Sequence, residues 1–169
     1  MSCTLYLLRH GIAEVGGPNA SDADRSLTED GTRKLAGVAA GLKRLGVAPD
    51  VVLSSPLRRA EQTAALVAEI IARDARVEIY PPLAPGHKPT DVLQGLGRHR
   101  RARQLMLVGH QPDLGELASF LLTGGADVTP LPFKKGGVAA IDVTALPLRD
   151  PGVLEWFLTP RQLRAIGRR

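Results

Sequence analysis

The fold of this chain is decided first at residues 5–11, which read LYLLRHG, an apolar run that ends at an arginine, a histidine and a glycine. A short apolar run rich in strand formers predicts a buried strand of a parallel sheet. In open α/β sheets, functional groups gather just beyond the carboxyl ends of the strands. We therefore expect Arg9 and His10 to lie at such an edge, where Gly11 lets the backbone turn closely.

The rest of the chain alternates between strand-like and helix-like segments. Apolar, strand-like runs occupy residues 5–8, 51–53, 77–80, 105–108, 138–143 and 153–158. Apolar residues at helical spacing predict a helix over 28–45, one with Ser55 as its cap and Pro56 as its first residue, a short one over about 90–96, and one opened by Pro112. The proline-rich residues 81–89 predict a loop. This order predicts a three-layer α/β/α sandwich with a mostly parallel central sheet of about six strands.

Length and composition favour one domain spanning residues 1–169. The chain has a mass of 18.0 kDa, and its 44% hydrophobic and 23% charged residues are typical of a soluble globular protein. Cys3 is the only cysteine, which excludes an internal disulfide. No segment approaches the roughly 20 apolar residues of a membrane span, and the first apolar run is too short for a secretory signal. These features predict a cytoplasmic protein with no membrane partner.

The net charge of +5 raises the question of an anionic partner. Basic residues concentrate in the segment Arg98 to Arg103 and in the tail Arg161 to Arg169. A nucleic-acid surface is one interpretation of such segments. Aromatic residues make up only 4% of the chain, which leaves little for base stacking. We therefore expect solvated helix ends rather than a nucleic-acid site.

Two further predicted strands are followed by polar motifs. Residues 54–63 read SSPLRRAEQT, and residues 109–112 read GHQP. If these strands are parallel to the first, both motifs share an edge with Arg9 and His10. Converging arginines, histidines and helix N-termini predict an anion site, with phosphate as the anion. Two arginine forks and a protonated histidine would neutralise a phosphate dianion and the charge that develops during its transfer.

Each of these residues also has an ordinary structural explanation. A histidine such as His110, between a strand and a helix, is commonly buried and hydrogen-bonded, and an arginine such as Arg59 in a first helical turn is commonly solvated. Gln62 and Thr63 follow Arg59 at helical spacing, so no acidic partner on that helix face accounts for it. Shared placement at strand ends favours the functional interpretation. There, positive charge would lower the pKa of His10 and favour the neutral, nucleophilic imidazole.

Together, the three motifs resemble those of the histidine phosphatase superfamily, which includes the phosphoglycerate mutases. The matching segments are LRHG at 8–11, SPLRRAEQT at 55–63 and VGHQP at 108–112, and the likeness extends to 25–31, 83–86 and 156–160. Within the superfamily the chain is most similar to the small SixA-type phosphohistidine phosphatases, over nearly its whole length. The resemblance implies a phosphoglycerate mutase-like form of the α/β/α sandwich.

The resemblance also implies a role for each matching residue. His10 would be the nucleophile that forms a covalent phosphohistidine intermediate. Arg9 and Arg59 would bind the phosphoryl oxygens, and His110 would donate to the transition state. Arg59 is the match because the family's arginine directly precedes the alanine, and Arg58 is the alternative. The implied substrate-binding residues are Arg9, Gly11, Arg25, Arg59 and His110.

The chain departs from many members of the superfamily in the loop after the third strand. That loop, residues 81–89, reads PPLAPGHKP and lacks the carboxylate that many of these phosphatases and mutases place there. A general acid assists a poor leaving group such as an alkoxide, whereas an imidazole takes a proton from solvent near neutral pH and departs neutral. The missing acid favours a phosphohistidine substrate. His87, Asp91 and Glu14 are the alternative proton donors.

The favoured function is hydrolysis of phosphohistidine on a partner protein, by a chain that we expect to be a monomer. No cofactor and no metal are expected, because the four histidines lack ligand-type spacing and arginines supply positive charge. One alternative is a general phosphomonoesterase acting on small phosphorylated metabolites. Another is a non-catalytic phospho-carrier, which would display its histidine on an exposed helix. His10 follows a predicted buried strand, which favours the enzyme.

Overall fold

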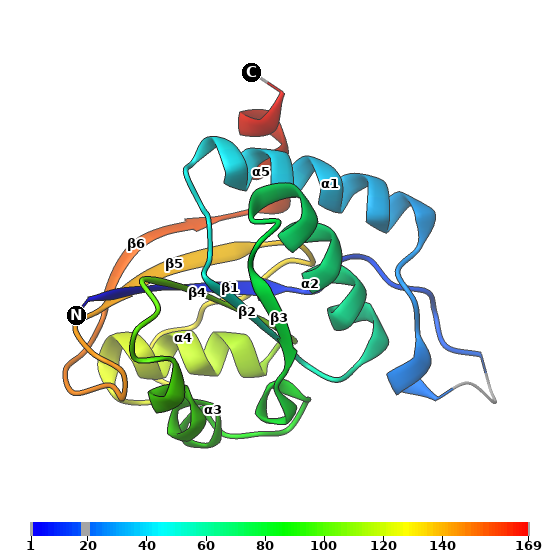
Figure 1. The fold of residues 1–169 in the computed structure, drawn as a ribbon. Helices are drawn as coiled ribbons and strands as arrows, with labels where there is room; N and C mark the ends of the chain where they lie inside the picture. Colours follow the sequence, from blue (N-terminus) through cyan, green and yellow to red (C-terminus); the bar gives the residue numbers. More distant parts are fainter. Residues whose placement is uncertain (1, 18–20, 169) are drawn as a thin grey trace.

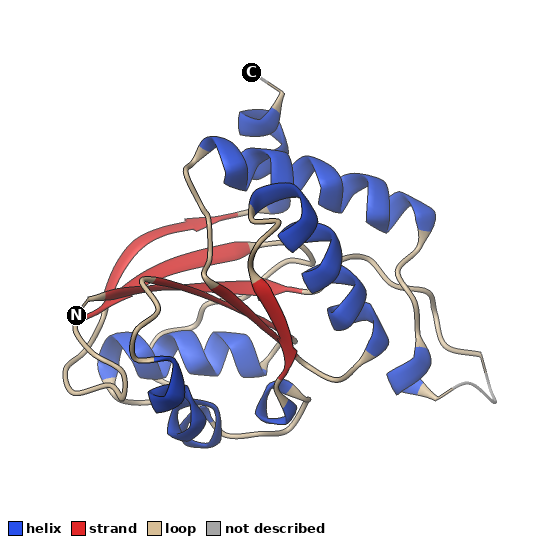
Figure 2. Cartoon of the chain, in the orientation of Figure 1, coloured by secondary structure: helices blue, strands red, loops and turns tan. Residues whose placement is uncertain are grey.

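The computed structural model describes residues 2–17 and 21–168, and it confirms the predicted three-layer α/β/α sandwich (Figure 1). Its strands are β1 (Cys3–Arg9), β2 (Val51–Ser54), β3 (Arg76–Ile79), β4 (Gln104–Gly109), β5 (Val138–Val143) and β6 (Val153–Leu158). Its α-helices are α1 (Glu29–Arg44), α2 (Arg58–Ile71), α3 (Pro89–Leu96), α4 (Asp113–Thr123) and α5 (Pro160–Gly167). Helices α1, α2 and α5 cover one face of the sheet, and α3 and α4 cover the other (Figure 2).

The sheet brings the ends of its central strands to one edge. Its strand order is β3-β2-β4-β1-β5-β6. The first four of these strands are parallel, whereas β5 is antiparallel to β1 and β6 is antiparallel to β5. The carboxyl ends of β1, β2 and β4 therefore meet at the same edge as the beginning of β5. This is the edge where the sequence motifs place their polar residues.

The core is divided by the sheet into two apolar layers. Alternate residues of β1 enter opposite layers, with Leu5 and Leu7 in one and Tyr6 and Leu8 in the other. This follows from the two-residue period of a strand. Both faces of the strand are covered, so its sequence is a continuous apolar run rather than an alternating one. The polar residues begin only where β1 leaves the core.

Helix α1 matches its prediction, whereas the starts of α2 and α4 differ from theirs and α5 was not predicted. Helix α1 begins after Thr28, whose Oγ1 accepts a hydrogen bond from the Gly31 amide at 2.9 Å. The predicted start of α2 at Ser55-Pro56 is wrong, because the helix begins at Arg58 and Leu57 occupies the cap position. Ser55 instead lies in the turn from β2, where its hydroxyl contacts His110. Pro112 precedes α4 as its cap rather than opening it.

Helix α5 occupies most of the basic tail and packs against α1. A Cβ at Gly41 of α1 would lie 2.1 Å from the carbonyl oxygen of Leu163, so only glycine permits this approach. The predicted basic segment extends to Arg169, which lies outside the described residues. None of the helices in the described ranges combines the length and apolarity that crossing a bilayer requires.

Candidate active site

Three buried side chains from separate motifs meet at the edge formed by β1, β2 and β4. His10 follows β1, His110 follows β4, and Arg59 is the second residue of α2. Their relative exposures are 5%, 4% and 5%, and the centroids of the two imidazole rings lie 5.0 Å apart. Arg58, by contrast, is exposed. The structure therefore brings Arg59, and not its neighbour, to the histidines.

The orientation of His10 turns the lone pair of one ring nitrogen toward Arg59. Its Nδ1 lies 2.7 Å from the carbonyl oxygen of Gly11. A carbonyl only accepts, so Nδ1 carries the proton and Nε2 holds the lone pair. Arg59 Nε approaches this Nε2 at 3.4 Å. Burial, followed by the charges of His110, Arg59 and Arg9, lowers the pKa of His10 from 6.5 to about 3. The predicted lowering is confirmed, with burial rather than positive charge as its main cause.

His110 is held by Ser55 and has one free ring nitrogen. Its Nε2 lies 2.7 Å from Oγ of Ser55, whereas its Nδ1 is buried without a hydrogen-bond partner among the described residues. Burial, followed by the charge of Arg59, lowers the pKa of His110 to about 4. Both histidines of the site are therefore neutral at pH 7. No sequence pattern marks Ser55 as a site residue, because a serine before a proline is also typical of a helix cap.

Arg59 is held by a carboxylate that the sequence analysis missed. Its Nη2 lies 2.9 Å from the carboxylate of Asp22, and its Nη1 donates to the Asp22 carbonyl oxygen at 2.6 Å. Asp22 begins the short 3₁₀ turn η1 (Asp22–Asp24). As expected, helix α2 provides no acidic partner, but a distant segment does. No local pattern in the sequence links two residues this far apart.

The same carboxylate also binds Arg25. Arg25 Nη1 lies 2.8 Å from Asp22 Oδ1, and Arg25 Nε donates to the Glu14 carbonyl oxygen at 2.6 Å. Hydrogen bonds from Arg25 and then from Arg59 lower the pKa of Asp22, so it is ionised. We call Asp22, Arg25 and Arg59 the Asp22 bridge. Arg25, predicted to line the site, thus reaches it through Asp22 rather than directly.

Arg9, the last residue of β1, has a buried donor without a partner among the described residues. Its Nη1 donates to the Phe133 carbonyl oxygen at 2.6 Å, and its Nε is buried without a partner among the described residues. Gly11, also predicted for the substrate site, has a structural contact as well. Its amide donates to Oγ1 of Thr63 at 3.0 Å, which fastens the end of β1 to α2.

Within the described residues, none of the three alternative proton donors is hydrogen-bonded to these side chains, although His87 lines a hollow that His110 also lines. His87 Nδ1 and Asp91 Oδ2 are 3.9 Å apart, and both side chains are exposed. Glu14 is exposed and contributes its backbone carbonyl to Arg25. None of the three donates a hydrogen bond to His10, Arg59 or His110 in the described part of the chain. Asp22 is joined to His10 through Arg59, which contacts both.

The described residues contain no cluster of three or more histidine, cysteine, aspartate or glutamate side chains arranged to hold a metal ion. The cations around His10 are guanidinium groups. Arg9 and Arg59 both contribute to lowering the pKa of His10, which shows that their charge is felt at the ring. This charge is in place to meet an anion.

Comparisons with known proteins agree with this geometry. Residues 5–84 match the model of the histidine phosphatase superfamily, branch 1. The chain is 30% identical to phosphohistidine phosphatase SixA of Escherichia coli over 95% of this chain and 96% of that protein. It is 38% identical to an uncharacterized protein of Picosynechococcus sp. over 81% of this chain and 83% of the relative.

A solved structure also shares the whole fold. The structure of the protein histidine phosphatase SixA complexed with tungstate superposes with a TM-score of 0.83 at 27% identity, over 95% of this chain and 99% of that one. The three motifs, the arrangement of His10, Arg59 and His110, and these similarities lead to one conclusion. This chain belongs to the histidine phosphatase superfamily, as a phosphatase of the SixA type.

Proposed function

We propose that this chain removes the phosphoryl group from phosphohistidine on a partner protein, with His10 as the nucleophile. The observation that carries the proposal is the state of His10. Its imidazole is buried, its pKa is lowered to about 3, and the proton on Nδ1 is held by the Gly11 carbonyl. Nε2 therefore offers its lone pair at neutral pH.

The reaction has two displacement steps. In the first, Nε2 of His10 bonds to phosphorus while the bond between phosphorus and the substrate imidazole breaks. The imidazole leaves with that electron pair and takes a proton from solvent. In the second, a water oxygen attacks phosphorus, the bond to His10 Nε2 breaks, and inorganic phosphate leaves. Each step has the in-line form of a phosphoryl transfer.

The anion would be held by donors that currently have no partner. Arg9 Nε and His110 Nδ1 are buried and unpaired in the described residues. Leaving a buried polar group unpaired costs about 1–3 kcal/mol. A phosphoryl oxygen would accept from Arg9 Nε, and from His110 when its proton sits on Nδ1. The guanidinium of Arg59, whose Nη1 and Nη2 already contact Asp22, would add positive charge beside His10. These arginines would neutralise the negative charge of the phosphoryl group, a role that a metal ion has in other phosphoryl-transfer sites.

The leaving group follows from the carboxylates at the site. Asp22 is the carboxylate bound to the site arginine, and its pKa is lowered. An ionised carboxylate has no proton to give an alkoxide. Imidazole needs no such donor near neutral pH. This favours a phosphohistidine over a phosphate monoester, and burial of His10 argues against a phospho-carrier.

The test compares leaving groups on one enzyme. Purified protein is incubated with a phosphohistidine peptide, a phosphoserine peptide of the same sequence and p-nitrophenyl phosphate. We expect turnover of the phosphohistidine peptide, and its loss in His10→Ala. Arg101→Ala, a change at an exposed residue of the basic segment Arg98 to Arg103, serves as the control and should retain turnover. Hydrolysis of phosphoserine with none of phosphohistidine would overturn the substrate, and full activity of His10→Ala would overturn the nucleophile.

A further inference from the structure

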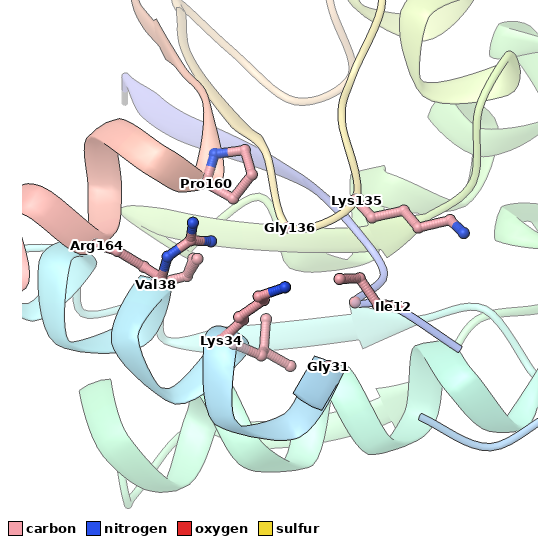
Figure 3. A pocket seen from close by; sticks show the side chains of 10 residues that line it. Ile12, Gly31, Lys34, Val38, Lys135, Gly136, Pro160 and Arg164 are labelled. Atoms are coloured by element: carbon pink, nitrogen blue, oxygen red, sulfur yellow. The ribbon is translucent and has the colours of Figure 1, made fainter. Parts of the chain in front are cut away.

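A hollow lies between α1, α5 and the start of β5, next to the site but outside it. It has a volume of about 180 Å³, and its lining includes Lys34, Lys135 and Arg164, which Figure 3 labels. Its apolar walls include Leu35, Val38 and Pro160. The hollow thus combines an apolar floor with a rim of positive charge.

The positive charge continues onto the neighbouring surface. A second, shallower hollow shares Pro160 and Arg164 with the first and adds Lys134 and Arg161. No aspartate or glutamate lines either hollow in the described residues. Lys34 pairs with Asp30, whereas the other four cations form no ion pair in the described part of the chain. We call this surface the cationic face, formed by Lys34, Lys134, Lys135, Arg161 and Arg164.

The cationic face begins one residue away from the proposed nucleophile. Gly11 and Gly136 both line the first hollow. The Gly11 carbonyl accepts the hydrogen bond from His10, and the Gly136 amide donates to the Arg9 carbonyl at 3.0 Å. This adjacency places the face within reach of a polypeptide whose phosphohistidine is bound at His10.

The position of Arg164 is fixed by helix packing. Its side-chain stem lies over Gly37 of α1, where a Cβ would be 3.1 Å from Arg164 Cγ. The close contact between Gly41 and Leu163 holds α5 against α1. An arginine side chain that packing already holds in place loses less conformational entropy when it binds a partner.

We infer that the cationic face binds an acidic segment beside the phosphohistidine of the partner protein. This inference rests on the function proposed above and names the chemistry of its partner. Four cations without internal partners favour a segment rich in aspartate and glutamate, and the apolar floor would take one apolar side chain between them. No aromatic side chain lines the two hollows in the described residues, so the face lacks the stacking platform of a single-stranded nucleic-acid site.

The experiment uses two phosphohistidine peptides that differ only in their flanks. One carries glutamates and the other lysines over about six residues on each side. At about 3.3 Å per extended residue, each flank spans about 20 Å. Free phosphohistidine is the third substrate. The variant Lys135→Glu/Arg164→Glu reverses two charges of the face, and the matched control Arg100→Glu/Arg101→Glu reverses two charges of the other basic segment.

We expect the wild-type protein to prefer the glutamate-flanked peptide by about tenfold in kcat/KM at low salt, with the preference declining as salt screens it. The Lys135→Glu/Arg164→Glu variant should lose or reverse that preference through KM, whereas Arg100→Glu/Arg101→Glu keeps it. Turnover of free phosphohistidine should be equal in all three proteins.

Each outcome separates docking from chemistry. An unchanged peptide preference in Lys135→Glu/Arg164→Glu would overturn the docking inference and leave the proposed function intact. A parallel loss with free phosphohistidine would show that the face serves a small phosphorylated ligand rather than a peptide. Absence of phosphohistidine turnover in the wild-type protein would reject the proposed function itself.

Discussion

Two adjacent arginines show that a shift of one position along a helix decides whether a side chain is exposed or buried at the site. Arg58 and Arg59 share a charge and a helical turn, yet Arg58 is exposed and Arg59 is buried beside His10. The rotation of about 100° per residue in a helix turns consecutive side chains to different sides. In the sequence only the family resemblance favours Arg59 over Arg58. In the structure, the packing of α2 against the sheet turns Arg59 toward His10.

This difference predicts unequal effects of two identical substitutions. Arg59→Ala removes the guanidinium that faces His10, and we expect kcat/KM for phosphohistidine peptide to fall about 10²–10³-fold, as for the loss of one transition-state donor. For Arg58→Ala we expect kcat/KM to stay within about twofold of the wild-type value, because the exposed charge of Arg58 is screened by solvent and salt. Steady-state kinetics of the two variants, with unfolding curves to confirm stability, measure this. Equal losses in both variants would contradict the assignment.

At the scale of elements, the turn η1 is attached to α2 by the Asp22 bridge. The Asp22 carboxylate occupies Arg59 Nη2 and Arg25 Nη1 at 2.9 and 2.8 Å. A phosphate would compete for the same guanidinium of Arg59. The ionised carboxylate therefore both positions Arg59 and weakens its attraction for an anion. Inorganic phosphate, the product, would likewise compete with the Asp22 carboxylate for the Arg59 guanidinium.

Removing that negative charge should strengthen phosphate binding. We expect Asp22→Asn to lower the inhibition constant of inorganic phosphate about fivefold, the scale of a solvent-exposed ion pair. Asp24→Asn is the control, because Asp24 lies in the same turn and forms no ion pair in the described residues. Product-inhibition kinetics give both constants. An inhibition constant that rises in Asp22→Asn would mean that the bridge serves to position Arg59 more than to compete with phosphate.

The Asp22 bridge also marks the limit of prediction from the sequence. Strands and helices follow from local periodicity, so the six strands and the bounds of α1 and α3 were predicted to within a few residues. The convergence of His10 and His110 was predicted because parallel strands end at one edge, and the family resemblance selected Arg59 over Arg58. Asp22 was missed because its contact depends on how a long connection folds back. Ser55 was misread because a serine before a proline has the same pattern whether it caps a helix or holds a histidine.

For the whole molecule, burying two neutral histidines couples folding to pH. The pKa of His10 is lowered to about 3 and that of His110 to about 4, from 6.5. Above pH 6.5 each histidine is neutral in both the folded and the unfolded chain, so neither makes the free energy of unfolding depend on pH. Below that, the unfolded chain binds protons that the folded chain does not. The free energy of unfolding then decreases as the pH falls, until each folded pKa is reached.

We therefore predict a loss of stability between pH 6.5 and pH 4 that is reduced by His10→Asn and by His110→Asn. Each group contributes up to roughly 1.4 kcal/mol per pH unit within its window. Urea unfolding at a series of pH values measures it, with His87→Asn, at an exposed histidine, as the control. If the variant and wild-type curves run parallel through this window, the two histidines do not bind protons on unfolding as described.

The reversed direction of β5 has a consequence for how such a protein can change. Because β5 is antiparallel to β1, the segment that precedes it, residues 124–137, arrives at the catalytic edge. This segment supplies the Phe133 carbonyl to Arg9 and the two lysines of the cationic face. A longer segment here would extend over the mouth of the site without moving any strand. A change in the length of this connection would therefore alter what borders the catalytic edge while leaving in place the residues that follow β1, β2 and β4.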